Sequence, residues 1–175
     1  MRAHEMNYLI KEVNDVNEFL DVYKVFRLEP YNELWPDEEI QEEFANLKKL
    51  GKVFGYYIGN KCAGIIAYYD IVRGEHPVEY PEDLKVLYFS DVAVLEEYRN
   101  KGIATKLLNH MMDFAKENAY DVVYMRTMQP DKSMSYSIVV KYGFKVMNGI
   151  LEDKSMVRSD GNEKSDSRIF LEYKF

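Results

Sequence analysis

The join between a long apolar strand and a strongly amphipathic helix is the feature that most constrains how this chain folds. Lys85 to Val94 is apolar except at Ser90 and Asp91, which is typical of a strand buried on both faces. From Lys101 to Ala119, apolar residues recur at helical spacing: Ala104, Leu107, Leu108, Met111, Met112 and Ala115. A strand that leads directly into such a helix predicts an α/β fold.

The turn between these two elements can hold an anion. The first amides of a helix have no intrahelical acceptor, and the aligned peptide dipoles favour negative charge beside them. Gly102 and the small Ala104 let a bulky phosphate approach the backbone, while Arg99 and Lys101 add positive charge and Thr105 adds a hydroxyl. We therefore predict a diphosphate site. The alternative is a solvated turn in which the glycine only separates the strand from the helix and binds nothing.

Other known phosphate-binding patterns are absent from the sequence. The spacing around Gly102 is not that of a dinucleotide-binding G-x-G-x-x-G, and no G-x-x-x-x-G-K-[ST] occurs. Neither a dinucleotide fold nor a P-loop is therefore indicated.

The rest of the chain divides into predicted strands and helices. A first strand at residues 8–13 precedes a helix capped by Asn14 or Asp15, and a second helix runs from about Asp37 to Gly51. Residues 53–58 and 62–69 form a hairpin around Gly59. The remaining predicted elements are a loop at 73–83, a strand at 122–125, a helix at 133–142, and two last strands, the second at 169–175. The charged, serine-rich stretch between those strands, Glu152 to Ser167, is predicted to be a mobile hairpin loop.

Composition limits the class of protein. A length of 175 residues is suited to one domain, 1–175. The net charge of −7 argues against non-specific nucleic-acid binding and suits a cationic partner, although solubility alone can also explain it.

Cys62 is the only cysteine, so no intrachain disulfide forms, and the three histidines lack metal-ligand spacing. With neither a signal peptide nor a run long enough to span a membrane, a cytoplasmic protein without metal is expected.

Two segments together carry a resemblance to a known family. Val92-Ala93-Val94 is followed five residues later by Arg99, with Gly102 and Ala104 at the expected spacing, and Lys141-Tyr142-Gly143-Phe144 follows downstream. The chain thereby resembles the GNAT N-acetyltransferase superfamily over nearly its whole length. The resemblance implies a GNAT fold, with a central mixed, mostly antiparallel sheet of about seven strands flanked by about four helices.

The resemblance also implies a site for acetyl-CoA. The backbone of Val92 and Val94 would pair with the pantetheine arm at a bulge, where the fourth strand splays from the fifth. The pyrophosphate would be held by Arg99 and by the turn residues Asn100, Lys101, Gly102, Ile103, Ala104 and Thr105. In the helix after Asp131, the family's usual Asn and Ala positions are occupied by Lys132 and Ser135, so the chain departs from the pattern there.

The family reaction is direct attack of a neutral primary amine on the acetyl-CoA thioester. Asp91, a carboxylate inside an apolar strand, is the candidate base; alternatively it caps the bulge or pairs with a basic residue. With regular pairing, Ser90 would point to the opposite face. In many relatives a tyrosine proposed as the general acid stands where this chain has Val139. The candidate acid here is therefore Tyr136, or else Tyr142. The alternative is that both tyrosines only pack against their neighbours.

The acceptor would be a small amine, a peptide N-terminus or a lysine. Tyr31 and Trp35, with Glu33 and Asp37 beside them, offer aromatic and acidic surface to a cation. A different function is also open: an inactive acyl-CoA-binding sensor or scaffold, suggested by Val139. No nucleic-acid or membrane partner is expected, and a homodimer is possible.

Overall fold

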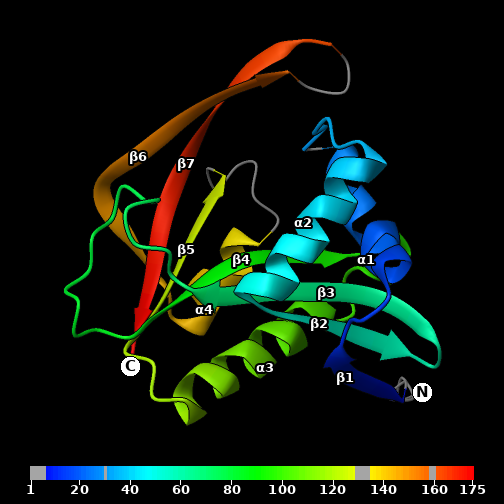
Figure 1. Ribbon diagram of the computed structural model, residues 1–175, viewed down its shortest axis with the longest axis horizontal. Helices are drawn as coiled ribbons and strands as arrows, with labels where there is room; N and C mark the ends of the chain where they lie inside the picture. The colour runs from blue at the N-terminus through cyan, green and yellow to red at the C-terminus, as the bar shows by residue number, and fades with distance from the viewer. Residues whose placement is uncertain (1–6, 30, 129–134, 158–160) are drawn as a thin grey trace.

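A single seven-stranded sheet forms the centre of the protein (Figure 1). The structure is a computed structural model that describes residues 7–29, 31–128, 135–157 and 161–175. Its strands are β1 (Tyr8–Glu12), β2 (Gly51–Ile58), β3 (Lys61–Asp70), β4 (Val86–Val94), β5 (Val122–Met128), β6 (Lys145–Val157) and β7 (Glu163–Lys174). They lie in the order β1-β2-β3-β4-β5-β7-β6, with β4 and β5 parallel and the other neighbours antiparallel. The mixed, mostly antiparallel sheet expected from the sequence is confirmed.

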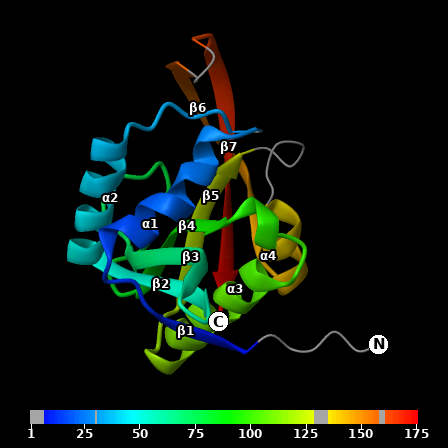
Figure 2. The same ribbon diagram turned by 90° about the vertical axis from the view of Figure 1, so that its right-hand side faces the viewer.

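In the described ranges, four α-helices cover the two faces of the sheet. They are α1 (Val16–Tyr23), α2 (Asp37–Leu50), α3 (Ile103–Glu117) and α4 (Tyr136–Tyr142). Figure 2 shows α1 and α2 on one face, with α3 and α4 on the other. The predicted start of the last helix, Ser133, lies outside the described residues, as does Lys132. Among the described residues, no helix is long and apolar enough to cross a lipid bilayer.

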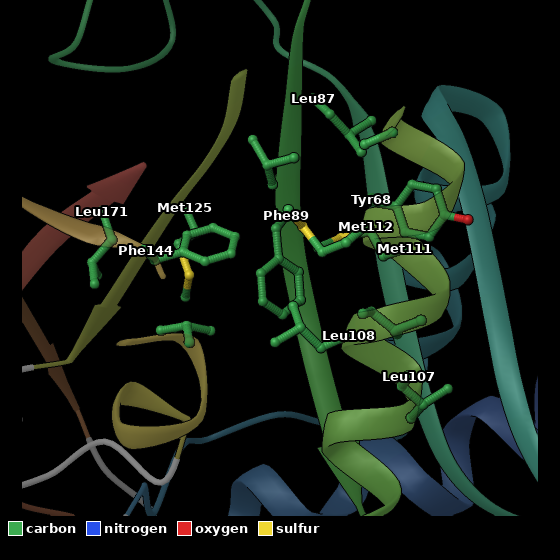
Figure 3. Packing of buried hydrophobic residues seen from close by; sticks show 14 of the residues in the cluster. Tyr68, Leu87, Phe89, Leu107, Leu108, Met111, Met112, Met125, Phe144 and Leu171 are labelled. Atoms are coloured by element: carbon green, nitrogen blue, oxygen red, sulfur yellow. The ribbon is translucent and has the colours of Figure 1, made fainter. Parts of the chain in front are cut away.

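The amphipathic face of α3 builds the larger core, as its periodicity predicts. Leu107, Leu108 and Met111 are almost completely buried and pack towards Phe89 of β4 and Met125 of β5 (Figure 3). A second core lies between α1, α2 and the opposite face of the sheet. Burying apolar side chains on both faces stabilises the central strands and fixes where β4 ends.

Local signals at the ends of elements also act as predicted. Asp15, one of the two expected caps, accepts a hydrogen bond from the backbone N–H of Asn17 over 2.8 Å at the start of α1. Gly59 takes a φ of +59° in the turn between β2 and β3, a conformation that glycine adopts without steric cost.

The stretch from Glu152 to Ser167 does form the predicted hairpin, but most of it is paired strand and not loop. Backbone pairing continues outward through Glu152–Arg168 to Val157–Glu163, so β6 and β7 form a hairpin arm that extends beyond the packed sheet (Figure 1). The charged sequence misled the prediction because strand pairing uses backbone groups and needs no apolar side chains once β7 is anchored in the core by Leu171. Residues 158–160, between the two strands, lie outside the described ranges.

Candidate functional site

The parallel strands β4 and β5 separate halfway along β4. They pair from Val86–Val122 to Phe89–Met125, after which β4 continues alongside β3 alone. In Figure 1 the two strands point away from each other beyond this place. The edge of β4 from Ser90 to Val94 is therefore left without a β5 partner.

A β-bulge at Ser90 marks the point of separation. Phe89 pairs with Tyr68 of β3 and Asp91 pairs with Ala67, so Ser90 is the extra residue on β4. The expectation that Ser90 and Asp91 point to opposite faces required regular pairing, and it was wrong because the bulge interrupts the alternation. Both residues line the same cavity.

The first of two cavities lies between the free edge of β4 and the start of α3. It has a volume of about 290 Å³ and is lined by nearly all the residues expected to hold the donor: Val92, Val94, Arg99, Asn100, Gly102, Ile103, Ala104 and Thr105. We call it the donor cavity. Ala93, Tyr98, Ser135 and Ile138 complete its wall, together with Val25, Phe26 and Tyr31 from the opposite side.

The backbone of the turn leaves room for a phosphate. Gly102 caps α3 with a φ of +79°, and a methyl group built on it would meet no atom within 4 Å. Asn100 also has a positive φ, of 62°. The amides that follow Gly102 therefore begin the helix beside open space, which is the arrangement that binds anions.

The two cations of the turn differ in position. Arg99 lines the donor cavity and donates from Nε to the carbonyl oxygen of Val94 over 3.3 Å. Lys101 is not among the residues that line it; its ammonium lies 5.3 Å from the centre of the Tyr98 ring.

A second cavity, of about 470 Å³, lies on the other side of Val92. We call it the acceptor cavity. It is bounded by α1, α2, the segment between them, and the adjoining parts of β3, β4, β5 and β7. The residues that line both cavities are Phe26, Tyr31, Val92 and Ser135. The two spaces therefore adjoin at the bulged part of β4.

Asp91 projects into the acceptor cavity with both oxygens hydrogen-bonded. Ser90 donates from Oγ to Oδ2 over 2.7 Å, and the Tyr23 hydroxyl donates to Oδ1 over 3.2 Å. Burial raises the pKa of Asp91, and these two donors, together with the charge of Arg126, partly offset the rise. A buried carboxylate with a raised pKa is suited to accept a proton. The hydrogen bonds also fit the alternative, in which Asp91 stabilises the bulge.

The predicted acceptor residues Tyr31 and Trp35 do line the acceptor cavity. Trp35 donates from its indole nitrogen to Glu33, and Glu33 lies 3.9 Å from a guanidinium nitrogen of Arg168 in β7. Asp37 is instead paired with Arg27, whose guanidinium lowers the pKa of that carboxyl. Asp37 is not among the lining residues.

The two tyrosines proposed as acids lie outside both cavities. Tyr136, the first residue of α4, packs against the core formed with α3. Tyr142, at the other end of the helix, is partly exposed and packs against the rings of Phe144 and Tyr173. Neither is among the described residues that line a cavity, although Ser135 beside Tyr136 lines both.

Sequence reasoning missed most residues of the acceptor cavity, among them the polar residues Tyr23, Glu43, Arg126 and Arg168. Arg126 gave a detectable signal, because it is a charged residue at the end of an apolar strand, as Asp91 is. Tyr23 was identified only as a core position. Glu43 and Arg168 carry no local signal, since a charge on a surface helix or next to the start of a predicted strand is ordinary.

No metal site emerges from the described ranges. No group of three or more His, Cys, Asp or Glu residues in them is arranged to hold a metal ion.

Comparison with known proteins agrees with this geometry. Residues 16–136 match the model of the acetyltransferase (GNAT) family. Streptothricin acetyltransferase A of Bacillus subtilis is 27% identical over 147 residues, which are 83% of this chain and 75% of the relative.

Solved structures share the fold at low sequence identity. An N-acetyltransferase from Staphylococcus aureus Mu50 superposes with a TM-score of 0.69 at 17% identity, covering 96% of this chain and 98% of the other. A GNAT family acetyltransferase from Elizabethkingia anophelis, solved with acetyl-CoA bound, superposes with a TM-score of 0.64 at 18% identity. The match covers 97% of this chain and 99% of the other. The matched family model spans both α1–α2 and the β4–α3 turn, and the chain therefore belongs to the acetyltransferase (GNAT) family.

Proposed function

We propose that this acetyltransferase transfers the acetyl group of acetyl-CoA to a primary amine by direct attack. The observation that carries the proposal is the meeting of the donor and acceptor cavities at Val92, one residue from the buried carboxylate of Asp91. A thioester at this junction would lie within reach of an amine held beside Asp91. The acetyl-CoA bound to the Elizabethkingia anophelis enzyme supports the choice of donor.

The donor cavity suits the two polar parts of coenzyme A. The diphosphate would lie against the amides from Asn100 to Thr105, with Arg99 adding positive charge. The amide groups of the pantetheine arm would pair with the backbone edge of β4 at Val92 and Val94, which β5 leaves free. The arm would then deliver the thioester to the bulge.

Asp91 would act as the base. An alkyl ammonium must lose a proton before its nitrogen can attack, and the carboxylate in the acceptor cavity would take that proton. The nitrogen then forms a bond to the carbonyl carbon and gives a tetrahedral intermediate. When the intermediate collapses, the carbon–sulfur bond breaks and the nitrogen gives up its second proton to solvent. A backbone amide near Val92 would stabilise the oxyanion that develops between these two events.

The departing thiolate needs a proton to become coenzyme A. Tyr136 remains the proposed acid on the strength of its place next to Ser135, which lines both cavities. Tyr136→Phe tests this role. Turnover should fall while acetyl-CoA binding is kept, and an unchanged turnover would assign the proton to another donor, such as water.

For the acceptor, a small amine is the class that we propose first. Streptothricin acetyltransferase A, a relative with which this chain shares most of its length, takes its name from a small molecule. The acceptor cavity has a volume of about 470 Å³, which suits a small acceptor.

Release of free thiol from acetyl-CoA, measured with a panel of primary amines, tests the proposed function. Amine-dependent release accompanied by an acetylated product of the expected mass would support it. Binding of acetyl-CoA without release across the panel would instead favour the sensor or scaffold.

A further inference from the structure

Two carboxylates of α2 form a row that leads along the acceptor cavity towards Asp91. Glu39 and Glu43 both line the cavity and are four residues apart on one helix. Residues at this spacing lie on the same face, with their Cβ atoms roughly 5–6 Å apart. Glu43 is also close enough to Asp91 for that charge, added to burial, to raise the pKa of the Glu43 carboxyl. The order along the cavity is therefore Glu39, Glu43, Asp91.

Negative charge in this cavity exceeds the positive charge that faces it. Arg126 acts on Asp91, and Arg168 lies beside Glu33, so each arginine already has a carboxylate nearby. Among the described residues, no ion pair is formed by Glu39 or Glu43. Like charges at the wall of a partly buried cavity repel each other, and a bound cation removes this repulsion.

Aromatic side chains line the same cavity as the carboxylates. Tyr31 and Trp35 line it together with Phe26 and Tyr23, whose rings make edge contacts with them at centroid distances of 5.2 and 5.7 Å. The faces of tyrosine and tryptophan attract ammonium groups. The cavity therefore offers a cation both carboxylates and ring faces.

We propose that the acceptor is a linear diamine or a molecule that contains one. The reacting amine is held between Asp91 and Glu43, and a second ammonium is held by Glu39 one helical turn away. A four-carbon chain is long enough to place its two amines one helical turn apart. This inference rests on the proposed function, because it concerns the acceptor of that reaction.

Binding of three probes of similar length tests the inference without turnover. 1,4-Diaminobutane, n-butylamine and 4-aminobutanoate are titrated calorimetrically into the protein loaded with coenzyme A, which carries no acetyl group to transfer. The diamine should bind about fivefold more tightly than butylamine, the upper range for an exposed ion pair, and 4-aminobutanoate more weakly than both. Steady-state thiol release is then measured with the same probes.

Glu39→Gln is the decisive variant, and Glu38→Gln is its matched control. Both remove one negative charge from an exposed position in the first turn of α2, but only Glu39 is among the residues that line the cavity. E39Q should abolish the tighter binding of the diamine relative to butylamine and leave butylamine binding unchanged. E38Q should still bind the diamine more tightly than butylamine.

The outcomes separate the inference from the proposed function. Equal affinity for diamine and butylamine, tightest binding of 4-aminobutanoate, or an equal loss in E38Q and E39Q would each overturn the diamine proposal. Tight diamine binding without thiol release from acetyl-CoA would instead overturn the proposed function while leaving the cation site in place.

Discussion

The Tyr23 hydroxyl donates a hydrogen bond to Oδ1 of Asp91 over 3.2 Å and so joins α1 to the bulged part of β4. Ser90 occupies the other carboxylate oxygen at 2.7 Å. These two donors orient the carboxylate and favour its charged form, whereas burial favours the neutral form. The balance between the two effects sets the pH at which Asp91 can accept a proton.

Replacing Tyr23 with phenylalanine should move the acidic limb of the pH profile of kcat/KM to higher pH. The hydrogen bond from Tyr23 lowers the pKa of Asp91, so its removal raises that pKa further. The shift should be about one to two units, the equivalent of one hydrogen bond to a charged group. The activity at the plateau should change little.

Tyr57→Phe is the control for this measurement. Tyr57 is buried in the same core as Tyr23 but donates its hydroxyl to Glu18, outside the acceptor cavity. If the acidic limb of the pH profile shifted equally in both variants, that limb would not reflect the ionisation of Asp91.

Asp91→Asn should lower turnover much more than it changes acetyl-CoA affinity. The amide oxygen can still accept hydrogen bonds from Ser90 and Tyr23, but the side chain can no longer take up a proton. A loss of about 100-fold or more in kcat is typical when a general base is removed. The measurements are kcat from thiol release and the Kd of acetyl-CoA from calorimetry. Full activity in this variant would exclude Asp91 as the base.

The same substitution should stabilise the fold near neutral pH. Because the pKa of Asp91 is raised in the folded state, the folded chain binds this proton more tightly than the unfolded chain does. Stability is therefore lost as pH rises from the unfolded pKa, about 3.9, through the raised folded value. Asparagine does not ionise, so the variant does not lose stability over this pH range.

Thermal unfolding at two pH values measures this effect. The Tm of D91N should exceed that of the unmodified chain at pH 7, by about 2–4 °C for each kcal/mol, and the difference should shrink below pH 4. A difference in Tm of equal size at both pH values would point to a cause other than the ionisation of Asp91.

The donor side of the site was predictable because it is continuous in sequence. The run from Val92 to Thr105 contains a strand end, a glycine turn and a helix start, and its local geometry follows from those residues. Asp91 was identifiable because a charge inside an apolar strand requires a partner or a use.

The acceptor side could not be assembled in the same way. Glu43 lies on α2 and Arg168 on β7, and only the packing of the sheet and helices brings them to one cavity. The bulge at Ser90 depends on the register with β3, which the residues around Ser90 do not encode alone. The length of strand pairing in the hairpin arm of β6 and β7 was missed because its charged side chains resemble those of a loop.

Gly102→Ala should raise the KM for acetyl-CoA and leave the KM for the amine unchanged. Gly102 has a φ of +79°, a left-handed conformation that costs other residues roughly 1–2 kcal/mol. A methyl group meets no atom there, so the effect comes from the backbone: relaxation of φ would turn the first amides of α3 away from the phosphate position. Gly59→Ala is the matched control, since Gly59 has a φ of +59°, equally open space and a place in the β2–β3 turn, away from both cavities. G59A should lower the Tm as G102A does but keep the acetyl-CoA KM, and equal KM values for the two variants would show that the α3 turn does not hold the diphosphate.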